Sequence, residues 1–324
     1  MDFTAVHRVQ VLRAKRKSRS LVKIALIAGS AVLVCSAIIA LILIERESFL
    51  GQNLGLLKNS DGRIVSCESL DVGYSENVEC YRLRYLSDGL EVVGFLIKPR
   101  QGGRYPAVIY NRGGSQEYGK IDNAALASLS HIISVENYVV VASQYRGNDG
   151  GEGREEYGGS DVNDVLNLIP MLESLPFVDP SKIAMAGVSR GGMMTYIAIK
   201  MTDKIKAAVV IGGITDLIQL YNEIPSMRPI LIELIGGTPE EKENEYKKRS
   251  AYYWPEKINT PVLILHGGAD YSVDVSQAEK LASELGELGK TYELVVYPGG
   301  SHGLTEYADN VLSKIREWFG SYLQ

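Results

Sequence analysis

The chain has 324 residues, an ordinary globular composition and a formal net charge of -5 at pH 7, which allows one large domain or two small ones. Residues 1–23 hold seven Lys/Arg against one Asp and residues 24–44 hold no charge, so removing this local +6 leaves -11 for residues 45–324. Because binding to phosphates requires a clustered basic surface, this distribution argues against nucleic acid as a partner of the main domain.

The first element predicted along the chain is a transmembrane helix over residues 24–44. This apolar run is long enough to cross a bilayer core as a helix. It follows the basic tail at residues 1–23, and the bias of positive charge toward the cytoplasm predicts a cytoplasmic N-terminus and an extracytoplasmic C-terminal domain. A cleaved signal peptide is the alternative, which the length of the run disfavours.

Residues 45–78 are predicted to connect the membrane helix to the main domain at residues 79–324. Mixed polarity and turn residues over 45–66 indicate little core. Cys67 and Cys80 lie outside the membrane run, and in an oxidising compartment they can close a small loop by a disulfide. Their spacing leaves the state of the two thiols open.

From residue 79 onward, strands are predicted to alternate with helices. Two β-rich stretches around Ser-Asp-Gly indicate a hairpin over residues 79–98. Further strands are expected at 105–111, 138–142, 206–211, 261–265 and 292–297 and before Ser189, and helices at 121–135, from Asp161, after Ser189, over 216–257, 275–288 and 305–322. This order predicts a mostly parallel sheet covered by helices on both faces, with 216–257 a candidate lid or pocket wall.

The stretch Lys182 to Tyr196 has the order of strand, sharp turn and helix that a nucleophile elbow requires, with Gly-Val-Ser-Arg-Gly-Gly at 187–192. Ser189 needs a strained backbone at this turn, and bulky side chains two residues to either side would collide, which explains Gly187 and Gly191. An ordinary glycine-rich turn is the alternative, so the interpretation requires a base and an acid elsewhere in the chain.

A serine nucleophile needs a histidine to accept its proton, and the four histidines are at positions 7, 131, 266 and 302. His302 is the predicted base because it lies in a loop just after the last strand, where open α/β sheets carry ligand-facing residues. His266, at the end of a buried strand, is predicted to be a structural or pocket residue.

The base needs an acid to hold its tautomer and to stabilise the imidazolium. Asp270 lies in the loop after the strand ending at residue 265, and the chain order Ser189, Asp270, His302 is that of α/β-hydrolases. Asp274 in the same loop is the alternative, although it is placed to cap the next helix.

Backbone N-H groups are expected to stabilise an oxyanion beside the serine. One is that of Arg190, the residue after the nucleophile, and the other is expected from Arg112 or Gly113 in the loop after an early strand. A turn that only needs positive φ is the alternative for this loop. Tyr145 and Arg146 are predicted to edge the substrate pocket.

From about residue 83 to residue 323 the chain resembles the catalytic domain of the prolyl oligopeptidase-like serine hydrolases, within the α/β-hydrolase fold. The matching motifs are Tyr85 to Pro99, Asn-Arg-Gly-Gly at 111–114, Tyr-Arg-Gly at 145–147, Gly-Val-Ser-Arg-Gly-Gly at 187–192, His-Gly-Gly-Ala-Asp at 266–270 and Gly-Ser-His-Gly at 300–303. The resemblance implies the same nucleophile, acid and base that the chemistry selects.

The chain also departs from that family. Many members carry a β-propeller that selects substrates by size, whereas fewer than forty residues separate the membrane run from the first matched strand, so we expect an ungated site. Some members use a tyrosine in the oxyanion loop, where this chain has Arg112. No paired-glutamate element for a peptide N-terminus is recognisable, which argues against dipeptidyl-peptidase activity.

The predicted protein is therefore a single-pass membrane protein with one α/β-hydrolase domain that cleaves peptide amides or esters through an acyl-enzyme. Peptidase activity follows from the resemblance, and carboxylesterase activity is the alternative. A catalytically silent receptor or adhesion module is an alternative of another class, which the intact Ser-Asp-His set disfavours. The chemistry requires no metal or organic cofactor, and the sequence leaves the substrate preference and the oligomeric state open.

Overall fold

The structure is a computed structural model that describes residues 49–72 and 76–324. The predicted basic tail at 1–23 and transmembrane helix at 24–44 lie outside the described residues. Within the described ranges, no helix is both long and apolar enough to cross a membrane. Residues Gln52–Gln324 form one unit, which contains all of the strands and helices named below.

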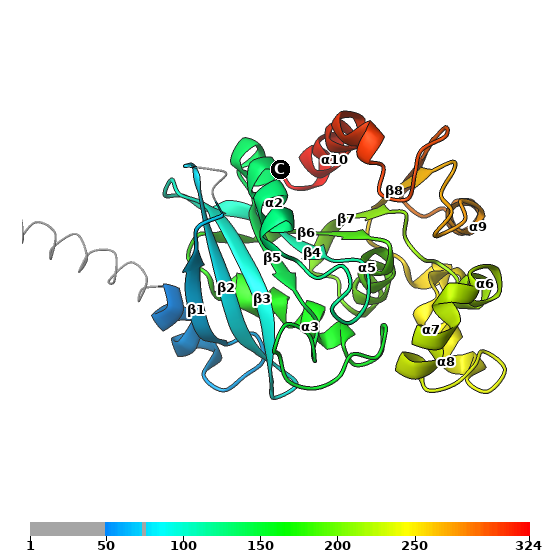
Figure 1. Ribbon diagram of the computed structural model, residues 1–324. Coiled ribbons are helices and arrows are strands. Elements are labelled where there is room, and N and C mark those ends of the chain that lie inside the picture. The colour runs from blue at the N-terminus through cyan, green and yellow to red at the C-terminus, as the bar shows by residue number, and fades with distance from the viewer. Residues whose placement is uncertain (1–48, 73–75) are drawn as a thin grey trace, which may run out of the picture. The chain divides into compact units, whose positions relative to one another are not determined.

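One nine-stranded sheet forms the centre of this unit (Figure 1). The strand order is β1-β2-β3-β5-β4-β6-β7-β8-β9, with antiparallel pairing from β1 to β5 and parallel pairing from β5 to β9. The strands are β1 (Ile64–Leu70), β2 (Val78–Ser87), β3 (Leu90–Pro99), β4 (Tyr105–Asn111), β5 (Val139–Ser143), β6 (Val178–Val188), β7 (Ile205–Ile211), β8 (Val262–Gly267) and β9 (Tyr292–Tyr297). The predicted hairpin and the predicted mostly parallel sheet are confirmed.

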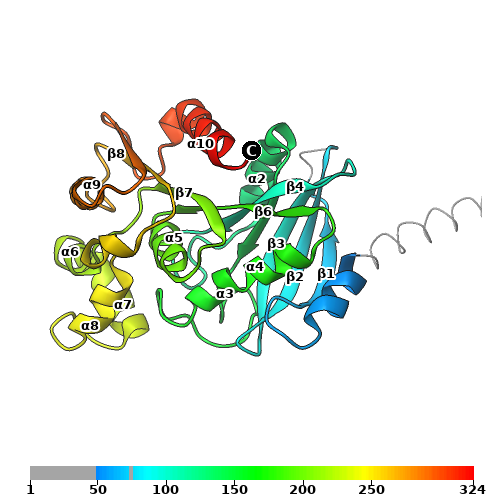
Figure 2. The ribbon, with the colours of Figure 1, turned by 180° about the vertical axis from the view of Figure 1, so that it is seen from behind.

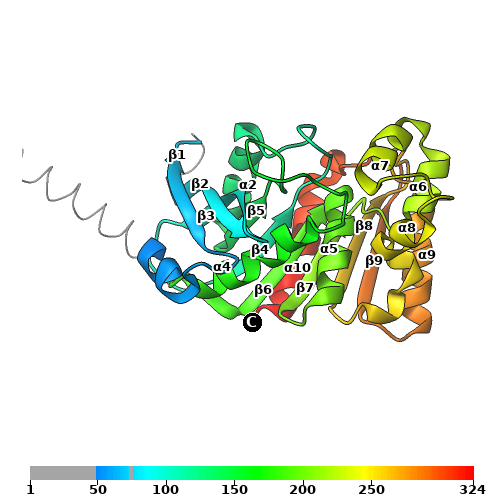
Figure 3. The same ribbon diagram turned by 90° about the horizontal axis from the view of Figure 1, so that it is seen from below.

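Helices cover both faces of the sheet (Figures 1 and 3). One face carries α2 (Asn123–Glu136) and α10 (Ala308–Tyr322), and the other carries α3 (Val162–Leu166), α4 (Leu168–Ser174) and α5 (Arg190–Met201). Every residue of β5 and β8 is buried, as expected for parallel strands covered on both sides. The apolar runs of these strands therefore form part of the core, and we look for reactive polar side chains in the loops at the strand ends.

Residues 216–257 are helical, as predicted, but divided into short pieces. They form α6 (Leu217–Glu223), α7 (Arg228–Ile235) and α8 (Glu243–Arg249). A turn of 3₁₀ helix joins α6 to α7, and two more follow α8. The group follows the carboxyl end of β7, and from behind it is seen beside α9 (Ser276–Glu287) (Figure 2). Gly236 ends α7 in the left-handed conformation that suits glycine.

The helix predicted to begin at Asp161 is two short helices, α3 and α4, which meet at Asn167. Pro170 lies in the first turn of α4, where the missing N-H costs little, whereas in one continuous helix its ring would collide with the carbonyl of Leu166. Asp161 makes no side-chain capping bond to α3. Its carboxylate instead pairs with Arg190, as described below.

Strand β1 is not indicated by the sequence, which predicts little core before residue 66. It pairs with β2 along its length, and Asn53 upstream of it is wholly buried. The Asn53 side chain accepts a 2.7 Å hydrogen bond from the Ile64 N-H and donates one of 2.7 Å to the Ser174 hydroxyl. These contacts bind the connector to α4.

The register of β1 against β2 decides the state of the two cysteines. Cys67 lies opposite Leu83, and Cys80 lies opposite Leu70, so the cysteines are offset by three positions, or about 10 Å along the strands. Disulfide geometry requires Cα atoms less than about 7 Å apart. The pair is not a disulfide in this structure, and the disulfide alternative is wrong for this fold.

Candidate active site

Ser189 occupies a sharp turn between β6 and α5. Its φ of 57° and ψ of -123° lie in a region that a residue with a Cβ rarely adopts, so the turn stores backbone strain. The Ser189 N-H donates a 2.9 Å hydrogen bond to the Ile211 carbonyl, which fixes the turn to the end of β7. A Cβ on Gly187 would collide with the Gly191 carbonyl, and a Cβ on Gly191 with that of Asn111. Glycine is therefore required at both positions.

Asp270 and His302 meet in loops that follow β8 and β9. The His302 Nδ1 lies 2.7 Å from the Asp270 Oδ2. Because an ionised carboxylate can only accept, Nδ1 is the donor in this contact, which leaves Nε2 as the ring nitrogen free of the acid. The Asp270 side chain is fully buried, whereas the His302 side chain is 28% exposed. The Asp270 carboxylate is therefore shielded from water, while the His302 ring remains partly accessible from outside.

Gly212 connects this pair to the serine turn. It directly follows Ile211, whose carbonyl binds the Ser189 N-H. A Cβ built on Gly212 would lie 3.1 Å from the His302 Nδ1 and 3.3 Å from the Asp270 Oδ2. All three predicted triad residues therefore gather at the carboxyl edge of the parallel strands, the edge at which open α/β sheets bind ligands.

Three further groups hold the Asp270 carboxylate. The backbone N-H groups of Ser272 and Val273 donate to Oδ1 at 2.8 and 2.9 Å, and the His266 Nε2 lies 3.2 Å from Oδ2 and 2.9 Å from the Val273 carbonyl. Burial alone would raise the pKa of Asp270, but hydrogen bonds from His266, His302 and the Val273 backbone outweigh it and hold that pKa well below its usual range. Asp270 is therefore ionised at neutral pH.

The other acid considered for this role, Asp274, has a local function. Its Oδ1 accepts a 2.9 Å hydrogen bond from the Ser276 N-H at the start of α9. His266 is fully buried and contacts the acid rather than solvent, which agrees with its predicted structural role.

The loop at residues 112–119, which we call the oxyanion loop after its predicted role, lies against Ser189. A Cβ on Gly113 would stand 3.3 Å from the Ser189 Cβ and 3.9 Å from its Oγ, so the bare backbone of Gly113 faces the serine. Arg190 is the first residue of α5, where the N-H groups have no intrahelical acceptor. The backbones of Gly113 and Arg190 therefore both lie next to Ser189.

The Arg112 side chain has another use. It is 1% exposed and its hydrogen bonds go to main-chain carbonyls, those of Gly113, Gln116, Tyr118 and Gln144, at 2.8 to 3.2 Å. Its Nη2 also lies 3.9 Å from the Glu155 carboxylate. Three of these carbonyls belong to the oxyanion loop itself. The Arg112 guanidinium therefore fixes the shape of the loop, and only its backbone faces the serine side.

Tyr145 and Arg146 require a correction, because neither side chain borders an open pocket. The Tyr145 ring is fully buried and its hydroxyl donates a 3.0 Å hydrogen bond to the Arg112 carbonyl. The Arg146 guanidinium is buried against Asp164 and also binds Asp88. Both residues support the loops around the site from beneath, and the sequence alone did not distinguish this role from contact with substrate.

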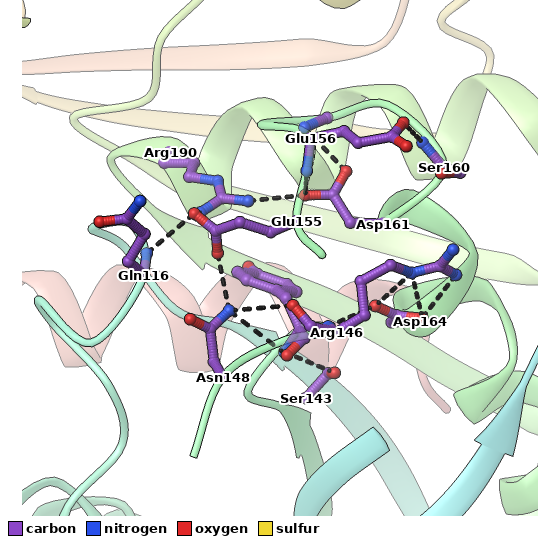
Figure 4. Close-up of polar contacts among 12 residues, drawn as sticks. Gln116, Ser143, Arg146, Asn148, Glu155, Glu156, Ser160, Asp161, Asp164 and Arg190 are labelled. Carbon is purple, nitrogen blue, oxygen red and sulfur yellow. Dashed lines mark hydrogen bonds and ion pairs between the residues drawn. The ribbon is translucent and has the colours of Figure 1, made fainter. Parts of the chain in front are cut away.

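Sequence reasoning missed two buried carboxylates near the elbow, Glu155 and Asp161 (Figure 4). Glu155 lies 2.9 Å and Asp161 2.7 Å from the Arg190 guanidinium, and all three side chains are at most 3% exposed. One signal was available, since a cation in the first turn of a helix opposes the helix dipole and needs a nearby anion. The sequence does not say which anion.

Comparison with known proteins agrees with this geometry. Residues 126–324 match the model of the prolyl oligopeptidase family. The uncharacterized peptidase YtmA of Bacillus subtilis is 34% identical over 229 residues, which are 70% of this chain and 88% of that protein. The uncharacterized peptidase YuxL of the same organism is 28% identical over 73% of this chain but only 38% of its own length.

Solved structures show the same fold. An acylaminoacyl peptidase of Pyrococcus horikoshii superposes with a TM-score of 0.66 at 26% identity and covers 76% of this chain and 42% of its own. Acetyl xylan esterase 1 from Thermoanaerobacterium covers 84% of this chain and 93% of its own with a TM-score of 0.60, at 18% identity. The chain thus spans less than half of several relatives but nearly the whole length of others.

Proposed function

The chain belongs to the prolyl oligopeptidase family, and we propose that it is a membrane-anchored serine hydrolase in which Ser189, His302 and Asp270 act as nucleophile, base and acid. One observation carries the proposal. The strained serine turn is bonded to Ile211, and the hydrogen-bonded pair of Asp270 and His302 packs over the next residue, Gly212.

The proposed reaction has two acyl-transfer steps. His302 Nε2 takes the proton of the Ser189 hydroxyl as Oγ attacks the carbonyl carbon, and the N-H groups of Arg190 and Gly113 stabilise the oxyanion. The imidazolium gives this proton to the leaving amine or alcohol, and an acyl-enzyme remains. Water, deprotonated by the same imidazole, releases the acid and restores the serine. Asp270 stays ionised and stabilises the imidazolium.

Peptide amides are the proposed substrates because relatives that match most of this chain are named peptidases. The fold does not decide the bond that is cleaved, since an esterase shares it. Carboxylesterase activity is therefore the second candidate. Membrane attachment is proposed from the apolar run at residues 24–44 and the basic residues before it.

Turnover on matched substrates tests the proposal. The purified chain is assayed on a short p-nitrophenyl ester and on an aminoacyl p-nitroanilide, with Ser189→Ala as control. We expect hydrolysis of both by the wild type and, because the triad acts as a unit, a loss of about 10⁴-fold or more in kcat in the variant. Hydrolysis of the ester alone would assign the esterase function, and no hydrolysis by the wild type would favour a silent binding module.

A further inference from the structure

The burial of the Arg190 side chain is energetically unfavourable in itself. Arg190 is the residue after the nucleophile and the first residue of α5, and its side chain is 1% exposed. Burying a cation costs several kcal/mol unless it is paired, and the positive end of the helix dipole adds to that cost. The backbone N-H of Arg190 would serve as an oxyanion donor with any side chain, so this donor role does not explain the buried guanidinium.

Both terminal nitrogens of the guanidinium are bound, whereas its Nε is buried without a hydrogen-bond partner among the described residues. Nη1 donates to the Glu155 Oε1 at 2.9 Å and to the Gly114 carbonyl at 3.1 Å, and Nη2 donates to the Asp161 Oδ2 at 2.7 Å (Figure 4). The rings of Tyr145 and Tyr157 lie 4.8 and 4.6 Å from its central carbon, within the range of cation-π attraction. These contacts fix both the position and the plane of the group.

Two of these contacts lead to the oxyanion loop. Gly114, whose carbonyl binds Nη1 directly, is adjacent to Gly113. The Glu155 Oε1 that binds Nη1 also accepts a 2.8 Å hydrogen bond from the Gln116 N-H. The loop is therefore bonded to the Arg190 side chain at one position directly and at a second position through Glu155.

The third contact, with Asp161, joins the guanidinium to the residues that precede α3 and not to the oxyanion loop. Asp161 accepts hydrogen bonds from Arg190 and from the backbone N-H groups of Glu156 and Gly158 at 2.7 to 3.2 Å. Since Glu155 and Asp161 are six residues apart on one segment, that segment acts as a brace behind the guanidinium. The brace explains why Asp161 does not cap α3.

We propose that Arg190 is a positioning residue, whose side chain holds the oxyanion loop against the elbow so that the N-H groups of Arg190 and Gly113 keep a fixed separation. One residue thereby supplies one donor through its backbone and sets the other through its side chain. The proposal rests on the proposed function, in which these two groups stabilise the oxyanion. Lysine cannot replace arginine here, because a single ammonium does not reach two carboxylates and a carbonyl in one plane.

Arg190→Lys tests the proposal, with Arg249→Lys as the matched control. Arg249 is also a buried arginine, 7% exposed and paired with Glu245. It donates a 3.4 Å hydrogen bond to the Glu156 carbonyl, in the same segment that braces Arg190, but among the interactions of the described residues it makes no contact with the oxyanion loop, so it controls for the loss of a buried arginine beside the brace. Loss of one oxyanion donor lowers kcat by about 10²- to 10³-fold. We expect Arg190→Lys to lower kcat by about 10- to 10³-fold with KM changed less than about threefold, and Arg249→Lys to keep kcat within about threefold.

Hydrogen-deuterium exchange on the same proteins gives a readout that does not depend on turnover. Arg190→Lys should speed exchange in peptides covering residues 113–119 and leave the β6 and β8 peptides unchanged, and Arg249→Lys should leave residues 113–119 unchanged. If Arg190→Lys fails to fold, Glu155→Gln, which keeps the side-chain shape, should show the same pattern more weakly.

Several outcomes would overturn the proposal. The first is a rise in the KM of Arg190→Lys without a fall in its kcat. The second is an equal loss of kcat in Arg190→Lys and Arg249→Lys. The third is unchanged hydrogen-deuterium exchange at residues 113–119 in Arg190→Lys. A wild type that neither turns over substrate nor reacts through Ser189 would remove the proposed function instead. In that case the exchange data alone still decide whether Arg190 holds the loop.

Discussion

The Asp270 carboxylate is held by several groups in the candidate site. Two backbone N-H groups and two histidines surround its buried carboxylate, so its charge is stabilised only in the folded chain. In the unfolded chain the same carboxyl has an ordinary pKa of about 3.9. The lowered pKa in the folded protein therefore couples the stability of the domain to pH.

Asp270→Asn should show this coupling. Because the folded pKa lies below the unfolded one, the stabilisation is fully present above about pH 4 and is lost as the pH falls toward the folded value. At pH 7 we expect the variant to lose about 2 kcal/mol of unfolding free energy. In urea unfolding curves, the difference in unfolding free energy between wild type and variant should shrink as the pH falls from about 4 to about 2.5. A free-energy difference that stays constant or grows over this interval would contradict the lowered pKa of Asp270 in the folded protein.

The proposed nucleophile, acid and base could be chosen from the sequence because each lies directly after a recognisable strand. The roles of Tyr145 and Arg146 could not, because exposure depends on what packs above a side chain. The hydrogen-bonding partners of the Arg190 guanidinium could not be predicted from the sequence either. Glu155 and Asp161 are 35 and 29 residues away in sequence, and no local pattern connects them to it.

Among the elements, the parallel strands were predictable because their apolar runs are buried on both faces. Strand β1 was missed because only one of its residues, Ile64, is buried, so its sequence lacks a clear alternation. It nevertheless pairs with β2 at Ile64 and from Ser66 to Leu70, with one irregularity between Ile64 and Ser66. An edge strand of this kind is formed by backbone hydrogen bonds to its neighbour more than by an apolar face of its own.

The β1 and β2 register predicts the thiol count of the protein. The chain has three cysteines, and without a disulfide between Cys67 and Cys80 all three should react with Ellman's reagent after unfolding in guanidinium without reductant. In the native protein Cys80 should react slowly, because burial raises the pKa of its thiol to about 11. Detection of a single thiol in the unfolded, unreduced chain would show that the register is wrong.

At the scale of the whole molecule, the proposed topology puts the hydrolase domain outside the cytoplasm. The basis is the seven basic residues at 1–23 and the apolar run after them. Protease added to intact cells should then remove the C-terminal domain, as detected with a C-terminal tag, while a cytoplasmic marker survives. A domain that is digested only after the cells are lysed would contradict this orientation.

The central claim is that Ser189 is an activated nucleophile, and covalent labelling tests it most directly. The protein is treated with a fluorophosphonate probe, and the modified peptide is identified by mass spectrometry. We predict one adduct, on Ser189, in the wild type and none in Ser189→Ala, with labelling of His302→Ala slowed by several orders of magnitude because the base is missing. Equal labelling of wild type and Ser189→Ala, or an adduct on another serine, would contradict the account.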